Sequence, residues 1–386
     1  MKIPFHKPNV PKDLNEVYNK SVREGWLTTG PNVNLFEQKL SNVLEVENVV
    51  AVNSCTAALH LALAAKEYNK GDKFIAPTYT FVASIEVGEY LGMEPILVDC
   101  DENFNIDVNK IENIVKKDSS IKAIIPVHFA GKPVDMECVN FISEKYNLFV
   151  LEDAAHALET ISNEGKVGNT KNAAAFSFYA NKNITTGGEG GALTTNDEEY
   201  AKKIRKLSLH GMSKDGWKRF KFGNKWEYDV SELGYKYNLT DMAASFGIWQ
   251  LDHLEEWHKK RFAIFNSYNK YFKNINGIKC PNVVSNIEKD AYHLYVIRLI
   301  PDLWTINRNE FIEKLNSYGI GTSVHYKPVH LHSYYSKKYF FNKNDLLIAE
   351  KFYNNVVSLP IYPELRNNDI EYIIEVILNI WSKYKK

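Results

Sequence analysis

Short apolar runs alternate with helix-forming stretches along the first half of the chain. The apolar runs lie at residues 48–54, 74–77, 95–99, 123–127 and 148–153. Helical patterns such as 33–44, 57–63 and 135–147 lie between and before them. Apolar strands linked by helices are typical of βαβ units, in which helices cover both faces of a mostly parallel sheet. The pattern predicts an α/β fold from residue 48 to about residue 210.

The pattern changes after residue 238. The residues from Asn238 to Asp241 can cap a helix, which is predicted to run through Leu251 towards Arg261 as a connector between domains. Further on, alternation at 293–299 predicts a half-buried strand, and helices are predicted at 308–318, 345–356 and 369–384. We therefore expect a large domain of residues 1–250 and a smaller α+β domain of residues 251–386. We expect that residues 1–20 can pack with the smaller domain.

One lysine, Lys182, lies in a polar loop between two β-prone runs. Glycines surround a glutamate just after it, at 187–191, and they let backbone approach a bound group closely. A lone loop lysine is usually a solvated side chain. Asp153 changes this interpretation, because an acid that follows a buried strand lies at the carboxyl edge of the sheet, where ligands bind. A lysine with a buried acid suits pyridoxal phosphate, since the lysine can form a Schiff base and the acid can keep the pyridine nitrogen protonated.

A phosphate site is available early in the chain. The strand at 48–54 leads through Ser54, Cys55 and Thr56 into a helix, and Ser54 or Thr56 can cap that helix. Free N–H groups and the helix dipole at such a start favour phosphate. An ordinary capped helix is the alternative interpretation. The segment at 78–84 opens a second helix, and an aromatic residue at such an opening can stack on a flat ring, although it is more often part of the core.

Composition excludes several classes of partner. The formal net charge is +0, which argues against nucleic acid or an anionic membrane as the main partner. No apolar run approaches the roughly 20 residues that span a bilayer. The 4 cysteines lack CxxC spacing and indicate neither a zinc site nor a disulfide framework, so a cytoplasmic location is expected. Three histidines, His325, His330 and His332, lack an acid or a cysteine to complete a metal set, which favours a solvated or substrate-facing loop.

Several motifs in this order resemble the sugar aminotransferases of the DegT/DnrJ/EryC1/StrS family. The similarity extends nearly from end to end of the chain. The motifs are GWLTTGP at 25–31, SCTAAL at 54–59, PTYTFVAS at 77–84, IPVHFAG at 125–131, EDAAHA at 152–157, the lysine loop at 176–191 and GYKYNLTD at 234–241. The resemblance implies the aspartate-aminotransferase-like fold, which is fold type I of the pyridoxal phosphate enzymes, and pyridoxal 5'-phosphate as the cofactor.

The resemblance also implies a role for each matching residue. Lys182 would be the catalytic Schiff-base lysine, Asp153 would hold the pyridine nitrogen, and His156 would lie near the ring hydroxyl. The other cofactor contacts would come from Cys55, Thr56, Phe81 and Ser177. Asn238 would reach the phosphate of a neighbouring subunit, which implies a homodimer with shared sites. The expected substrate contacts are Thr29, Arg219, His325 and Tyr326.

The chain departs from the family pattern at two positions. Cys55 stands where many members have glycine, which leaves a backbone contact intact. The turn TTGGEGG at 185–191 has one glycine more than the common form, so its geometry beside the cofactor is expected to differ.

The expected reaction moves the amino group of L-glutamate to a UDP-linked 4-keto sugar and releases 2-oxoglutarate. A 3-aminotransferase for a dTDP-linked 3-keto sugar is an alternative that differs only in pocket contacts. A pyridoxamine-dependent sugar dehydratase is another, although such enzymes carry histidine at the position of Lys182. A protein that only binds nucleotide-sugar is the alternative from a different class.

Overall fold

A seven-stranded sheet forms the centre of the larger part of the molecule. The structure is a computed structural model that describes residues 2–212, 229–285 and 288–386. The strand order is β1-β9-β8-β5-β4-β2-β3. The strands are β1 (Asn48–Val52), β2 (Lys73–Pro77), β3 (Glu94–Val98), β4 (Ile121–Ile124), β5 (Phe149–Asp153), β8 (Ala173–Ser177) and β9 (Gly191–Thr195). A small hairpin, β6 (Ile161–Ser162) with β7 (Gly165–Lys166), lies outside this sheet.

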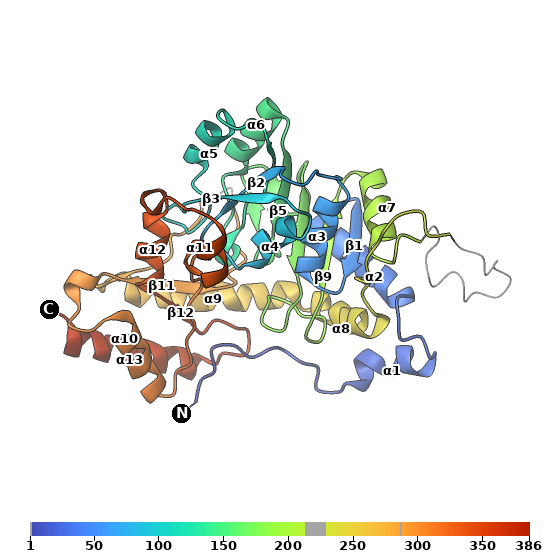
Figure 1. The fold of residues 1–386 in the computed structure, drawn as a ribbon. Coiled ribbons are helices and arrows are strands. Elements are labelled where there is room, and N and C mark those ends of the chain that lie inside the picture. The colour runs from blue at the N-terminus through green and yellow to red at the C-terminus, as the bar shows by residue number, and fades with distance from the viewer. Residues whose placement is uncertain (1, 213–228, 286–287) are drawn as a thin grey trace.

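Helices cover both faces of this sheet, as the sequence predicts (Figure 1). Successive residues of β1 show the two faces: Val50 and Val52 belong to one apolar cluster, and Val49 and Ala51 belong to another. The first cluster includes α3 (Cys55–Ala64), α4 (Ala83–Glu89) and α7 (Glu198–Leu207). The other face packs against α2 (Pro31–Leu44), α5 (Val108–Val115), α6 (Met136–Tyr146) and α8 (Asp241–Asp252). The predicted α/β fold is confirmed.

One strand runs against the others. The pairs among β2, β3, β4, β5 and β8 are parallel, whereas β9 is antiparallel to both β8 and β1. This register pairs Gly191 with Ser177 on one side and with Val52 on the other. The first residue of β9 therefore lies at the same sheet edge as the last residues of β1 and β8, and this is the edge at which β5 ends in Asp153.

The connector helix is broken where a continuous helix was predicted. α8 ends at Asp252, and α9 (Leu254–Phe272) begins after His253. The carbonyl of Trp249 accepts a hydrogen bond from the His253 ring Nδ1 at 2.8 Å, and the His253 backbone N–H donates to Gln250 instead. The side chain thus takes the place of an ordinary helical backbone bond, and α9 then continues well beyond Arg261.

The C-terminal part is built on a three-stranded antiparallel sheet. Its strands are β10 (Ile278–Lys279), β11 (Tyr295–Leu299) and β12 (Val356–Leu359). Its helices are α10 (Arg308–Ser317), α11 (Ser333–Lys338), α12 (Leu347–Tyr353) and α13 (Asn367–Tyr384). The predicted helix at 345–356 is therefore too long, because its last residue begins β12.

Strand β11 is buried on both faces, so the prediction of a half-buried strand is wrong. Tyr295 and Ile297 pack into a cluster with α9 and α13. Val296 points the other way and packs in a second cluster with Phe352 of α12.

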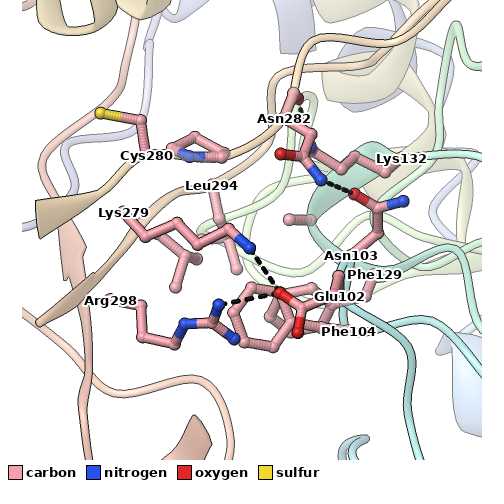
Figure 2. Close-up of a pocket in the computed structure, with 13 residues that line it drawn as sticks. Glu102, Asn103, Phe104, Phe129, Lys132, Lys279, Cys280, Asn282, Leu294 and Arg298 are labelled. Carbon is pink, nitrogen blue, oxygen red and sulfur yellow. Dashed lines mark hydrogen bonds and ion pairs between the residues drawn. The ribbon is translucent and has the colours of Figure 1, made fainter. Parts of the chain in front are cut away.

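Polar contacts also join this sheet to the larger part of the molecule. Glu102 accepts hydrogen bonds from Lys279 at 2.5 Å and from Arg298 at 2.8 Å, around a cavity of about 20 Å³ (Figure 2).

The N-terminal segment begins beside the C-terminal elements and then runs to α1 (Asn15–Arg23) (Figure 1). The backbone N–H of Ile3 donates to Gly319, and that of Gly321 donates to Ile3. Gln250 of α8 donates to the carbonyl of Asn9. These bonds hold the segment against both parts of the chain. The division into domains at residue 250 stays a prediction.

Candidate active site

A cavity of about 520 Å³ opens at the carboxyl edge of β5 and β8. It is bounded by the start of α3, the loop before α4, the lysine loop and a loop of the C-terminal part. Most of the residues predicted for the site line it: Cys55, Thr56, Phe81, Asp153, His156, Ser177, Lys182, His325 and Tyr326. Residues far apart in the sequence are therefore brought together as the alternation of strands and helices requires.

The start of α3 has the geometry of a cradle that can hold an anion. Ser54 caps the helix, and its hydroxyl accepts from the N–H of Ala57 at 3.0 Å. The first N–H groups of α3 then face the cavity edge with the positive end of the helix dipole. Gly191 passes so close that a Cβ on it would lie 2.4 Å from the Ser54 carbonyl carbon and 2.5 Å from the Cys55 nitrogen. Only glycine fits here, so backbone can line the cradle from two sides.

Asp153 is held as a buried acid. Its side chain is 5% exposed, and its oxygens accept from the Ser84 hydroxyl at 2.6 Å and from the N–H of Ala155 at 3.1 Å. Burial raises the pKa of Asp153, and the bonds from Ser84 and Ala155 and the charge of Lys182 offset this only in part. A carboxylate in this setting gains from any cationic N–H that enters the cavity.

Lys182 is brought close to Asp153 by the turn after β8. Its backbone N–H donates to Tyr179 at 2.9 Å. Burial lowers the pKa of Lys182 to about 8, although the charges of Cys55 and Asp153 act in the opposite direction. Near neutral pH the neutral amine, which is the form that acts as nucleophile and base, is therefore a minor form of Lys182 but far more populated than in an ordinary exposed lysine.

Competitive labelling of the apoprotein with acetic anhydride tests this pKa. We expect the reactivity of Lys182 to rise with pH and to reach its midpoint near pH 8, because the neutral amine is the reactive form. The same lysine in urea-unfolded chain should titrate near its ordinary pKa of about 10.4. Mass spectrometry of the labelled peptide gives both curves, and equal midpoints would contradict the effect of burial.

The turn after Lys182 accommodates its extra glycine through the backbone. Gly187 has φ 90° and Gly188 has φ 133°, which are conformations that favour glycine. The carbonyl of Gly188 accepts from Ala180, and its N–H donates to the Thr185 hydroxyl at 3.1 Å. These bonds fold the turn back on the loop that carries Lys182.

The opposite wall comes from the C-terminal part of the chain. Tyr326 contributes its hydroxyl, which lies 3.1 Å from Nε2 of His156. The Phe81 ring is 58% exposed at the cavity, 6.0 Å from the Tyr326 ring. His325 lines the cavity, but its Nδ1 is bonded to the Ser358 hydroxyl at 2.8 Å and its carbonyl accepts from Tyr79.

Two of the predicted residues that the structure describes do not line this cavity. Asn238 and Thr29 are hydrogen-bonded to each other at 2.7 Å, and neither lines it. Arg219 lies outside the described residues. Sequence reasoning missed Ser84, the partner of Asp153, although it ends the motif at 77–84. It also missed His293, whose ring lies 4.4 Å from that of His156.

The histidines of the C-terminal loop make ordinary hydrogen bonds. His330 is bonded to Thr78 at 2.6 Å and Glu350 at 3.1 Å, and His332 donates to the Lys327 carbonyl. Across the part of the chain that the structure describes, no group of residues is arranged to hold a metal ion. In the same residues no helix is both long and apolar enough to cross a membrane.

These groups fit one cofactor. A buried acid, a lysine of lowered pKa, an exposed aromatic ring and a helix start packed against Gly191 match the ring nitrogen, the carbonyl, the flat ring and the phosphate of pyridoxal phosphate. The site and the fold therefore define a pyridoxal phosphate enzyme of fold type I.

The chain belongs to the DegT/DnrJ/EryC1/StrS aminotransferase family, whose sequence model matches residues 8–378. It is 41% identical over 380 residues to the spore coat polysaccharide biosynthesis protein SpsC of Bacillus subtilis, covering 98% of this chain and 97% of that protein. The family resemblance inferred from the motifs is confirmed.

Solved structures agree with this assignment. Spr1654 of Streptococcus pneumoniae, named as a putative sugar aminotransferase and solved in its PMP form, has a TM-score of 0.91 and 32% identity, covering 99% of this chain and 100% of that chain. Its PLP form also has a TM-score of 0.91, with 31% identity over 99% of each chain. Helicobacter pylori PseC, an aminotransferase involved in the biosynthesis of pseudoaminic acid, has a TM-score of 0.90 and 29% identity, covering 99% and 100%.

Proposed function

We propose that this protein moves the amino group of L-glutamate to the keto carbon of a UDP-linked 4-keto or 4-keto-6-deoxy sugar. The amino sugar would serve the synthesis of a surface polysaccharide, lipopolysaccharide or glycan. Family membership supports amino transfer. The names of SpsC and PseC support a role in making polysaccharides or unusual sugars.

The observation that carries the proposal is the pairing of Lys182 and Asp153 in one cavity beside the start of α3. Bound pyridoxal phosphate supplies a carbonyl that combines with amines and a ring that takes up electrons. Beyond these groups the wall is polar, with Asn181, Glu189 and Tyr326 among its residues. Such a wall suits a ligand that carries hydroxyl groups.

Different residues of the chain have different roles in the proposed reaction. Asp153 would hold a protonated ring nitrogen through its buried carboxylate, and the α3 start with Thr56 and Ser177 would hold the phosphate. Nζ of Lys182 takes the Cα proton of glutamate and later delivers a proton to the sugar carbon that was the ketone. Its lowered pKa, about 8, supports this use as a base.

We further propose a homodimer with shared sites in the cytoplasm. Asn238 and Thr29 bond to each other outside the cavity of their own chain, so the phosphate or substrate that they are proposed to contact would be bound in the site of a partner. Arg219 and the loop of His325 and Tyr326 are proposed to contact the nucleotide-sugar.

The test uses the holoenzyme with L-glutamate and, in parallel, a UDP-4-keto-6-deoxy sugar and a dTDP-3-keto-6-deoxy sugar. We expect one equivalent of 2-oxoglutarate for each amino sugar, with the amine on C4 by NMR. An amine on C3 would instead identify a 3-aminotransferase. Loss of a sugar hydroxyl without use of glutamate would identify a dehydratase, and no reaction with either sugar would contradict the proposal.

A further inference from the structure

His156 has both ring nitrogens occupied. The backbone N–H of Ala130 donates to Nδ1 at 3.2 Å. A backbone N–H can only donate, so Nδ1 carries no proton. Burial, with the charges of Lys182 and His325, lowers the pKa of His156 well below its ordinary value, so the ring is neutral and its one proton is on Nε2.

The Nε2 proton points at Tyr326. Its hydroxyl oxygen lies 3.1 Å from Nε2, and it accepts this hydrogen bond because Nε2 is the donor. Burial, and then the charge of Asp153, raises the pKa of Tyr326, so the phenol keeps its own proton. Among the residues that the structure describes, no second partner of this hydroxyl is seen. Its O–H is therefore free to point into the cavity that both residues line.

A second histidine keeps the His156 ring in this orientation. The ring of His293 lies 4.4 Å from it at an interplanar angle of 39°. The amide of Asn183 donates to the Ala291 carbonyl at 2.8 Å, so its oxygen faces His293 Nδ1 at 3.0 Å and accepts a proton from it. Because Asn183 follows Lys182, the lysine loop and the segment before β11 together fix the ring that directs Tyr326.

We propose that the Tyr326 hydroxyl donates a hydrogen bond to an oxygen of a bound reactant, and that His156 and His293 are the positioning residues that aim it. The proposal rests on the proposed function. It changes the expectation for His156, whose own nitrogens are both engaged within the protein. The acceptor is a partly negative oxygen, supplied either by the cofactor ring or by the sugar.

Tyr326→Phe in the holoenzyme tests the donor and distinguishes the two sources. We expect kcat/KM to fall about 10- to 100-fold. This is the usual loss when an enzyme can no longer donate a hydrogen bond to a charged group or to an atom that becomes charged in the transition state. If the ring oxygen is the acceptor, the visible absorbance band of the substrate-free holoenzyme and its pH dependence shift. If the sugar is the acceptor, that band is unchanged and the KM for the sugar rises.

Tyr200→Phe is the matched control, because Tyr200 also donates a buried hydroxyl bond, to the Ala62 carbonyl, but it is outside the cavity. We expect it to change kcat/KM less than about threefold. Equal effects of the two variants, or no effect of Tyr326→Phe on any of these measurements, would overturn the proposal. His156→Gln, which keeps a donor, should retain more activity than His156→Leu.

The orientation is tested independently of activity. In apoprotein with ¹⁵N-labelled histidine, the signals lost in His156→Gln should belong to a neutral ring protonated on Nε2. A ring protonated on Nδ1, or a charged ring at neutral pH, would overturn the positioning argument. Because this measurement needs no substrate, it keeps its meaning even if wild-type protein transfers no amino group to any sugar, which would contradict the proposed function alone.

Discussion

Lys182→Ala is expected to reduce amino transfer by at least about 10³-fold, because it removes the proposed nucleophile and proton carrier of the site. The lysine approaches the cavity from a turn whose bonds do not involve its side chain, so the variant should fold. Turnover is measured as 2-oxoglutarate formed from L-glutamate. Adding a small primary amine to the variant should restore part of the activity, since the cavity then has room for it.

A matched substitution separates this effect from the loss of any partly buried lysine. Burial also lowers the pKa of Lys66, which packs against Phe149 and Tyr200 outside the cavity. Lys66→Ala should leave turnover within about threefold of wild type. If Lys182→Ala kept a tenth of wild-type turnover, another group would have to carry the proton, and the assignment of Lys182 would be wrong.

Local pattern identified the sheet and much of the site because both depend on short-range rules. Apolar runs and helix caps reveal strand ends, and strand ends define the sheet edge where Asp153 and the start of α3 meet. The pattern therefore predicts that Lys182 and Asp153 belong to one site at this edge. The two residues are far apart in the sequence, but the order of strands and helices determines which strand ends lie at the same edge of the sheet.

Contacts between segments that are far apart in the sequence could not be predicted from the sequence pattern. Alternation at 293–299 predicts a half-buried strand, but it does not show that α12 covers the second face of β11. The helix break at His253 involves the hydrogen bond from its ring Nδ1 to the Trp249 carbonyl, which a periodic pattern does not reveal. Ser84 has its role because its hydroxyl reaches Asp153. His293 has its role because its ring lies beside that of His156. A periodic pattern gives the direction of a side chain, but it does not give its partner.

Two neighbouring buried acids offer a final contrast between function and stability. Asp153 faces the cavity, whereas Glu152, on the other side of β5, accepts hydrogen bonds from His128 at 3.0 Å and Thr170 at 2.6 Å. Burial alone raises the pKa of Glu152, but its bonds from His128, Thr170 and Asn172 outweigh this and hold it below its ordinary value. Strand alternation separates the two carboxylates and so gives them different tasks.

Asp153→Asn is expected to lower kcat about 10²- to 10³-fold, since the cavity loses the charge that holds a protonated ring nitrogen. The amide oxygen can still accept from the N–H of Ala155 and its NH2 can donate to the Ser84 hydroxyl, so the thermal midpoint of the apoprotein should change little. Glu152→Gln should do the reverse and lower the free energy of unfolding by about 1–3 kcal/mol while kcat stays within about threefold. Thermal unfolding and turnover of both variants give this comparison.

The pH dependence of unfolding adds a check on sign. A carboxyl whose folded pKa is below its unfolded value stabilises the fold above the unfolded pKa, and this stabilisation is lost as pH falls through the folded pKa. Wild-type protein should therefore lose stability below about pH 4.5, the ordinary pKa of Glu152, and Glu152→Gln should lose less over the same range. If instead Glu152→Gln lost turnover and Asp153→Asn lost stability, the acid that serves the reaction would be Glu152, and the assignment built on the cavity would fail.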